Sequence, residues 1–72
     1  MSKLEQAIKK MGLEVSFVDE VMCFGNDTHN FMVEDMGDHF YIEVFDEAED
    51  EIIAQKEYKT IPTVLSLIKK YN

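Results

Sequence analysis

The spacing of the hydrophobic residues changes twice along this chain of 72 residues. In segments 4–11 and 61–71 they recur three or four positions apart, which is the apolar stripe of an amphipathic helix. Between residues 13 and 58 they alternate with polar residues, as in strands that bury one face. This order predicts a helix, a group of strands and a second helix. A chain of this length forms one domain, so residues 1–72 are expected to be a single small α+β domain.

The strand-forming part is divided by turn residues such as Gly, Asn and Asp. Five segments have strand character, at 13–17, 21–24, 30–34, 39–45 and 51–58. We predict an antiparallel meander of three to four strands, with the N- and C-terminal helices packed on one face of the sheet. The pattern does not decide which side of segment 21–24 meets the helices, because one extra residue in the turn after it would exchange the two sides.

The turn at Asp35–Asp38 sets the predicted pairing of the two central strands. Closing it with a short loop places Val33 opposite Phe40 and Phe31 opposite Ile42 on one face. That face is expected to lie under both helices. The residues predicted to be buried together are Phe31, Val33, Phe40, Ile42, Val44, Leu65 and Ile68.

The other face of the same hairpin mixes apolar and acidic side chains. The predicted pairing puts Met32 opposite Tyr41 and Glu34 opposite His39, with Phe45 further along the strand. An apolar strip bordered by charge is typical of protein interfaces, where aromatic residues and Met are enriched. The sequence therefore predicts a protein-contact face made of Met32, Glu34, Tyr41, Glu43 and Phe45.

Charge is distributed unevenly along the chain. There is no Arg, the seven Lys lie towards the two ends, and thirteen of the fifteen Asp and Glu residues fall between positions 11 and 55. Neutralising nucleic-acid phosphates requires clustered Lys and Arg, so direct binding to nucleic acid is not expected. The formal net charge of -8 instead favours a partner protein with a basic surface. The alternative is that the acidic residues only keep the protein in solution.

Few residues in the sequence suggest a catalytic or metal-binding site. Cys23 and His29 would form a nucleophile and its base if the intervening turn brought them together, but a domain this small has little volume for a catalytic cleft. His29 and His39 are expected on opposite sheet faces, and the acidic turns lack the residue pattern of a calcium loop. A single cysteine excludes an internal disulfide. We therefore expect no catalytic residue, no cofactor and no metal site.

These patterns favour a non-enzymatic protein-interaction module, a regulatory or inhibitory binder of a basic partner. Two alternatives stay open: a homo-oligomeric structural or accessory protein, such as a homodimer, and a nucleic-acid mimic that occupies the basic groove of an enzyme. No apolar run is long enough to span a membrane and the first residues do not resemble a signal peptide, so a cytoplasmic location is expected. The composition, rich in Lys, Glu, Asp and Ile without Arg, resembles that of small reading frames of low-GC bacteria and their phages.

Overall fold

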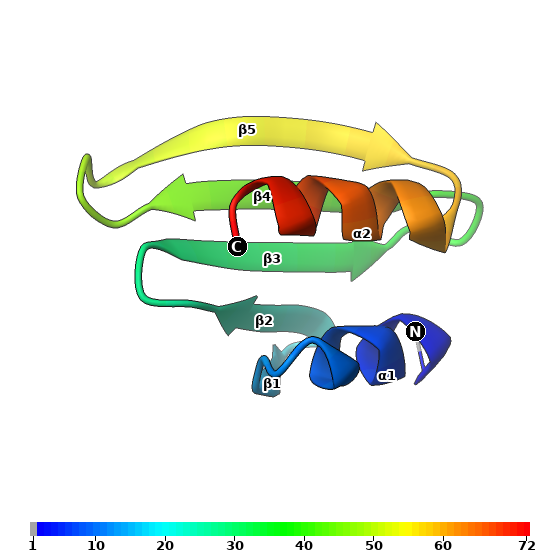
Figure 1. The fold of residues 1–72 in the computed structure, drawn as a ribbon. Helices are drawn as coiled ribbons and strands as arrows, with labels where there is room; N and C mark the ends of the chain where they lie inside the picture. The colour runs from blue at the N-terminus through cyan, green and yellow to red at the C-terminus, as the bar shows by residue number, and fades with distance from the viewer. Residues whose placement is uncertain (1) are drawn as a thin grey trace.

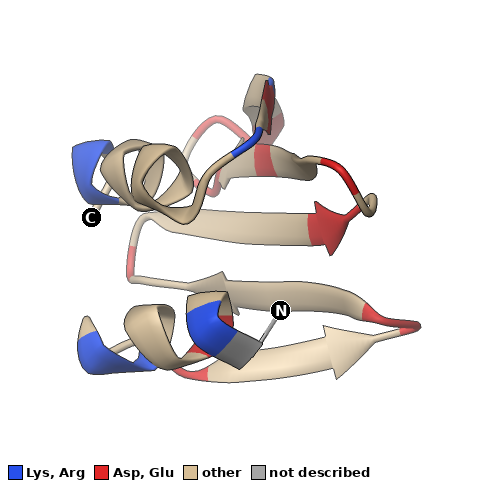
Figure 2. Ribbon diagram, turned by 90° about the vertical axis from the view of Figure 1, so that its right-hand side faces the viewer, with Lys and Arg blue, Asp and Glu red and all other residues tan. Residues whose placement is uncertain are grey.

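The computed structural model describes residues 2–72 and contains two helices and five strands (Figure 1). In chain order the elements are α1 (Ser2–Lys10), β1 (Val15–Val18), β2 (Val21–Gly25), β3 (His29–Asp35), β4 (Phe40–Asp46), β5 (Glu51–Tyr58) and α2 (Ile61–Lys70). The strands form one antiparallel sheet in the order β1-β2-β3-β4-β5, and both helices lie on the same side of it (Figures 1 and 2). We call the helix-covered side the inner face and the opposite side the outer face. The predicted α+β meander is confirmed, with five strands in place of three to four.

All five segments with strand character form strands, and a tight hairpin joins the first two, β1 and β2. Val18 pairs with Val21, so only Asp19 and Glu20 form the loop. Both residues have positive φ, 50° and 69°. Positive φ at both loop positions is the mark of a type I′ turn, whose twist matches that of the strands but which normally uses Asn-Gly. The hairpin therefore forms at a sequence that carries no such turn signal.

The β3–β4 hairpin is paired two positions away from the predicted register. Val33 pairs with Ile42 and not with Phe40, and Phe31 pairs with Val44 and not with Ile42. The predicted pairs are therefore wrong. A shift by an even number of residues keeps every side chain on its face, so the division between inner and outer residues is as predicted.

The shift originates in the loop between the two strands. Asp35 still pairs with Phe40, so the loop starts one residue later than expected. The Met36 N–H donates to the His39 carbonyl oxygen, and the Gly37 N–H donates to the Asp35 carboxylate, both at 2.9 Å. Gly37 has a φ of 100°, which glycine adopts readily and other residues do not. These contacts fix a loop at residues 36–39, one position further along the chain than the predicted turn at Asp35–Asp38.

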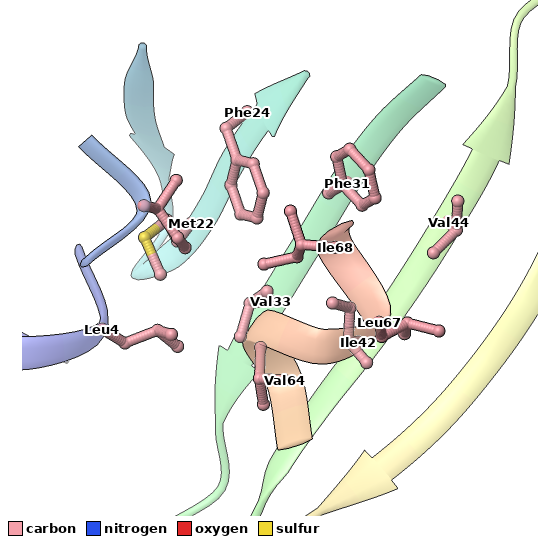
Figure 3. Close-up of a cluster of buried hydrophobic side chains, with 11 residues drawn as sticks. Leu4, Met22, Phe24, Phe31, Val33, Ile42, Val44, Val64, Leu67 and Ile68 are labelled. Carbon is pink, nitrogen blue, oxygen red and sulfur yellow. The ribbon is translucent and has the colours of Figure 1, made fainter. Parts of the chain in front are cut away.

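The core lies between the inner face and the two helices (Figure 3). Its buried side chains are Leu4, Ile8, Met22, Phe24, Phe31, Val33, Ile42, Val44, Val64, Leu67 and Ile68. Five of the seven residues predicted to be buried together belong to this set, whereas Phe40 and Leu65 are only partly buried and pack against it. Phe40 is the first residue of its strand, beside the loop, and α2 turns Leu67 rather than Leu65 fully towards the sheet.

One side chain ties the end of α2 to the sheet. Asn26, in the turn between β2 and β3, accepts hydrogen bonds through Oδ1 from the N–H groups of Thr28 and His29, at 2.9 and 2.8 Å. Its Nδ2 donates to the carbonyl oxygen of Tyr71 at 3.0 Å, across 45 positions of sequence. Asn26 therefore both shapes the local turn and holds the helix end against it.

Candidate functional site

The outer face carries an open groove that crosses all five strands. Its volume of about 570 Å³ is within the range of pockets that hold small molecules. The side chains that line it are apolar at Cys23, Met32, Phe45 and Ile52, and polar at Glu14, Ser16, Asn30 and Glu43. We call this feature the outer groove.

The five residues predicted to form a contact face all belong to the outer face, but they fall into two groups. Met32, Glu43 and Phe45 line the outer groove. Glu34 and Tyr41 pair with each other nearer to the β3–β4 loop and are not part of its lining. The predicted pairing of Met32 with Tyr41 is wrong, because the register shift places Met32 opposite Glu43.

Two apolar groove residues were not among the predicted site residues. Cys23 pairs with Met32, which settles the face of β2 that the sequence left open. Ile52 pairs with Phe45 because Ile53 is the extra residue of a bulge, and a bulge changes which side chains share a face. The only sequence signal for either residue is its hydrophobicity, since the faces depend on turn length and on the bulge.

The carboxylate of Glu43 has a fixed position on the outer face. From the neighbouring strand, Gln55 Nε2 donates to Glu43 Oε2 at 3.3 Å. Burial raises the pKa of Tyr41, and a hydrogen bond to Glu43 and the charge of that carboxylate raise this pKa further. The Tyr41 hydroxyl therefore stays protonated at neutral pH and keeps its proton as a hydrogen-bond donor.

Gly25 contributes only backbone to the outer groove, because no side chain fits at this position. A Cβ there would overlap the Asn30 side chain and would lie 2.8 Å from the His29 carbonyl oxygen. Asn30 is itself held by the hydrogen bond that its Nδ2 donates to the Glu47 carboxylate. A glycine in a strand often marks such a close approach of backbone and neighbour.

Charge divides the molecule into two sides (Figure 2). Most Lys residues lie on the two helices, whereas Asp and Glu lie mainly on the strands and the loops that join them. Within residues 2–72 a single Lys lies in a strand, Lys56, and it faces inward because it pairs with Ile42. The strand residues Glu34, Glu43 and Glu57 therefore give the outer face a negative charge that no strand Lys offsets.

His39 lies between two carboxylates at one margin of the outer face. Its Nδ1 lies 2.6 Å from Asp38 Oδ1, and its Nε2 lies 3.3 Å from Glu57 Oε1. The hydrogen bond with Asp38 raises the pKa of His39, against a smaller opposing effect of burial, and it lowers the pKa of Asp38. His39 is a loop residue and does not lie opposite Glu34, where the predicted register placed it.

The hypothesis that Cys23 and His29 act together is wrong. Cys23 lines the outer groove, whereas the His29 ring lies 5.1 Å from the Tyr71 ring, at the end of α2 on the inner face. The His29 Nε2 is 3.9 Å from Asp46 Oδ2 on the same side. Over residues 2–72, no three His, Cys, Asp or Glu side chains are placed to hold a metal ion together.

Comparison with known proteins adds nothing to the functional picture: no protein-family model, curated protein or solved structure matches this chain. In the part of the chain from residue 2 to residue 72, neither helix has the length and apolar character needed to cross a membrane.

Proposed function

We propose that the protein is a non-enzymatic interaction module that binds a basic protein through its outer face. The observation that carries this proposal is the outer groove, an apolar depression with carboxylates in its lining, on a sheet face that neither helix covers. An antiparallel sheet with one solvent-facing side usually keeps that side polar. Here Met32, Phe45 and Ile52 leave apolar surface exposed in the groove, where a partner side chain would bury it.

Charge selects the kind of partner. Glu34, Glu43 and Glu57 would attract Lys and Arg around an apolar anchor and would accelerate association. Two copies docked through this face would bring the same glutamates together, which disfavours self-association. Nucleic acid is not a ligand in this proposal, because phosphates would be repelled by the same carboxylates. A regulatory or inhibitory role, exerted by occupying a basic surface, is the function that these features support best.

Affinity capture from an extract of the native host tests the proposal. The bait is the wild-type protein or one of two outer-face variants, Glu34→Lys/Glu43→Lys and Tyr41→Ala. A control variant, Asp27→Lys/Glu49→Lys, changes the net charge by the same amount as the first variant but in exposed loops. We expect basic proteins that bind the wild type and the control to be lost from both outer-face variants, and to be released by salt. Retention of every captured protein by both outer-face variants, with folding intact by circular dichroism, would refute the proposal.

A further inference from the structure

The two edges of the sheet differ in how they are protected against further strands. β1 and β5 each pair on one side only, so each edge offers backbone N–H and C=O groups to another chain. Natural proteins protect such edges with charged residues, bulges and inward-pointing charges. β5 has all three: Lys56 points inward opposite Ile42, Ile53 forms a bulge, and Glu51 and Glu57 lie along the strand.

β1 has none of these three features, and its only protection of this kind is its short length of four residues. Its sequence, Val-Ser-Phe-Val, contains no charged residue and no proline, and its register with β2 runs without a bulge. Phe17 is 47% exposed and Val18 is 60% exposed. The outer groove reaches this strand, since Val15 and Ser16 contribute to its lining. An apolar edge without charge or bulge that adjoins an apolar groove is a surface that a partner strand would cover.

We propose that an extended basic segment of the partner protein adds to the β1 edge as a further strand; this inference rests on the proposed function. The backbone of Val15–Val18 pairs with the segment, which is a common mode of peptide recognition. Ser16 lines the outer groove and Phe17 pairs with the buried Met22, so these two neighbours face opposite sides of the sheet. Alternate side chains of the segment therefore reach the groove on one side and Phe17 on the other.

The charged residues that flank β1 are all acidic and match a basic segment. Glu14 precedes β1, and Asp19 and Glu20 follow it, so Lys or Arg residues at either end of the segment meet carboxylates. The β5 edge carries charges of both signs, because Lys56 lies between Glu51 and Glu57 in the strand and Lys59 follows it. Edge protection therefore selects β1, and the carboxylates on both sides of β1 favour a basic segment there.

A second copy of this chain fits the β1 edge poorly. If β1 paired with itself in antiparallel fashion, with Val15 opposite Val18, Glu14 of each copy would lie opposite Asp19 of the other. Like charges directly opposite each other destabilise a strand pair. The formal net charge of -8 on each copy adds to this repulsion.

A peptide titration tests strand addition. The isotope-labelled full chain is mixed with a synthetic peptide of alternating Lys and Val, and exchange of each backbone amide is followed by NMR. A second peptide is N-methylated at alternate residues, so that it keeps the side chains and charge but loses the N–H groups of one edge. We expect the first peptide to slow exchange in β1 and not in β5, and the N-methylated peptide to bind at least about tenfold more weakly. A Glu–Val peptide should not bind.

Two lysine variants locate the contact. Val18→Lys places a positive charge on β1, and the control Ile53→Lys places the same charge on β5, where Ile53 is 37% exposed. We expect Val18→Lys to weaken binding of the Lys–Val peptide about tenfold and Ile53→Lys to leave it unchanged. The reverse pattern, with binding lost only in Ile53→Lys, would overturn the assignment to β1.

The outcomes separate strand addition from the wider proposal. Equal binding of the N-methylated peptide, with NMR shifts confined to the outer groove, overturns strand addition and leaves outer-face binding standing. Failure of the Lys–Val peptide to bind also overturns strand addition alone, because affinity capture with the Glu34→Lys/Glu43→Lys variant tests the outer face independently. Dimerisation through β1, seen by sedimentation and abolished by Val18→Lys, would make a second copy the occupant and overturn the proposal.

Discussion

Replacing Glu20 by glycine is expected to stabilise the protein, although it deletes a side chain. Glu20 has a φ of 69° in the two-residue turn between β1 and β2. This left-handed conformation costs a residue with a Cβ about 1–2 kcal/mol. Glycine avoids that cost but loses more backbone freedom on folding, which offsets about 0.5–1 kcal/mol. The difference predicts a gain of about 0.5–1 kcal/mol in the free energy of unfolding.

Thermal and urea denaturation, followed by circular dichroism, measure this gain. In a domain of this size it corresponds to a rise in Tm of roughly 2–8 °C. Two control variants distinguish the effect of backbone conformation on stability from the effect of charge. Glu20→Gln removes the charge and keeps the conformational cost. Glu20→Asn also removes the charge but introduces a residue that tolerates positive φ. Stability should therefore fall in the order Gly, Asn, Gln. If the Glu20→Gly protein is no more stable than Glu20→Gln, the turn does not hold the strain assigned to it.

Three further variants test the core, the outer groove and the histidine at its margin. Ile42→Ala should lower the free energy of unfolding by about 2–5 kcal/mol in urea, because Ile42 is fully buried, and a loss below about 1 kcal/mol would place Ile42 outside the core. Gly25→Ala should cost about 1–3 kcal/mol in the same assay, because its Cβ would lie 2.8 Å from the His29 carbonyl oxygen; an unchanged midpoint would contradict that crowding. The pKa of His39 is raised above its ordinary value of 6.5, so its contact with Asp38 stabilises the fold below pH 6.5 and this stabilisation is lost as the pH rises through the raised pKa. In the His39→Gln variant, the denaturation midpoint should fall less steeply as the pH rises through neutrality. If the midpoint depends on pH as it does in the wild type, the contact between His39 and Asp38 is not the cause of the fall.

The order of elements and the two faces of the sheet were predictable because both depend on local hydrophobic spacing. Alternation around Phe31 and Val33, and around Ile42 and Val44, decides which side chains meet the helices, and an even shift of register leaves that decision intact. The register itself depends on the loop that contains Gly37, whose backbone no hydrophobic pattern describes. The turn between β1 and β2 lacks the residues that usually mark a hairpin, so the sequence pattern did not show that the first two segments pair with each other.

The outer groove was predictable only in part. Met32 and Phe45 follow from alternation along β3 and β4. Cys23 and Ile52 required the length of one turn and the position of one bulge, which are properties of the backbone rather than of the side-chain pattern. Tyr41 shows the opposite case, because it lies on the predicted face but the true register moves it out of the groove.

We expect the two hydrogen-bonding ends of the Asn26 side chain to act at different stages of folding. Each strand pairs with its neighbour in sequence, so the sheet assembles by closing short loops, whereas the contact from Asn26 to Tyr71 joins residues 45 positions apart. Contacts over long separations carry a larger loop-closure entropy and tend to form late. The Oδ1 of Asn26 would therefore organise its turn early, and its Nδ2 would fix α2 afterwards.

Asn26→Asp separates these stages, because it keeps the acceptor that the turn needs and removes the donor that reaches Tyr71. In stopped-flow measurements the variant should unfold faster and fold at nearly the wild-type rate. If folding slows instead, the end of α2 is already docked in the transition state. The closing of the helix over the sheet would then limit how fast this protein reaches its native state, rather than the pairing of its strands.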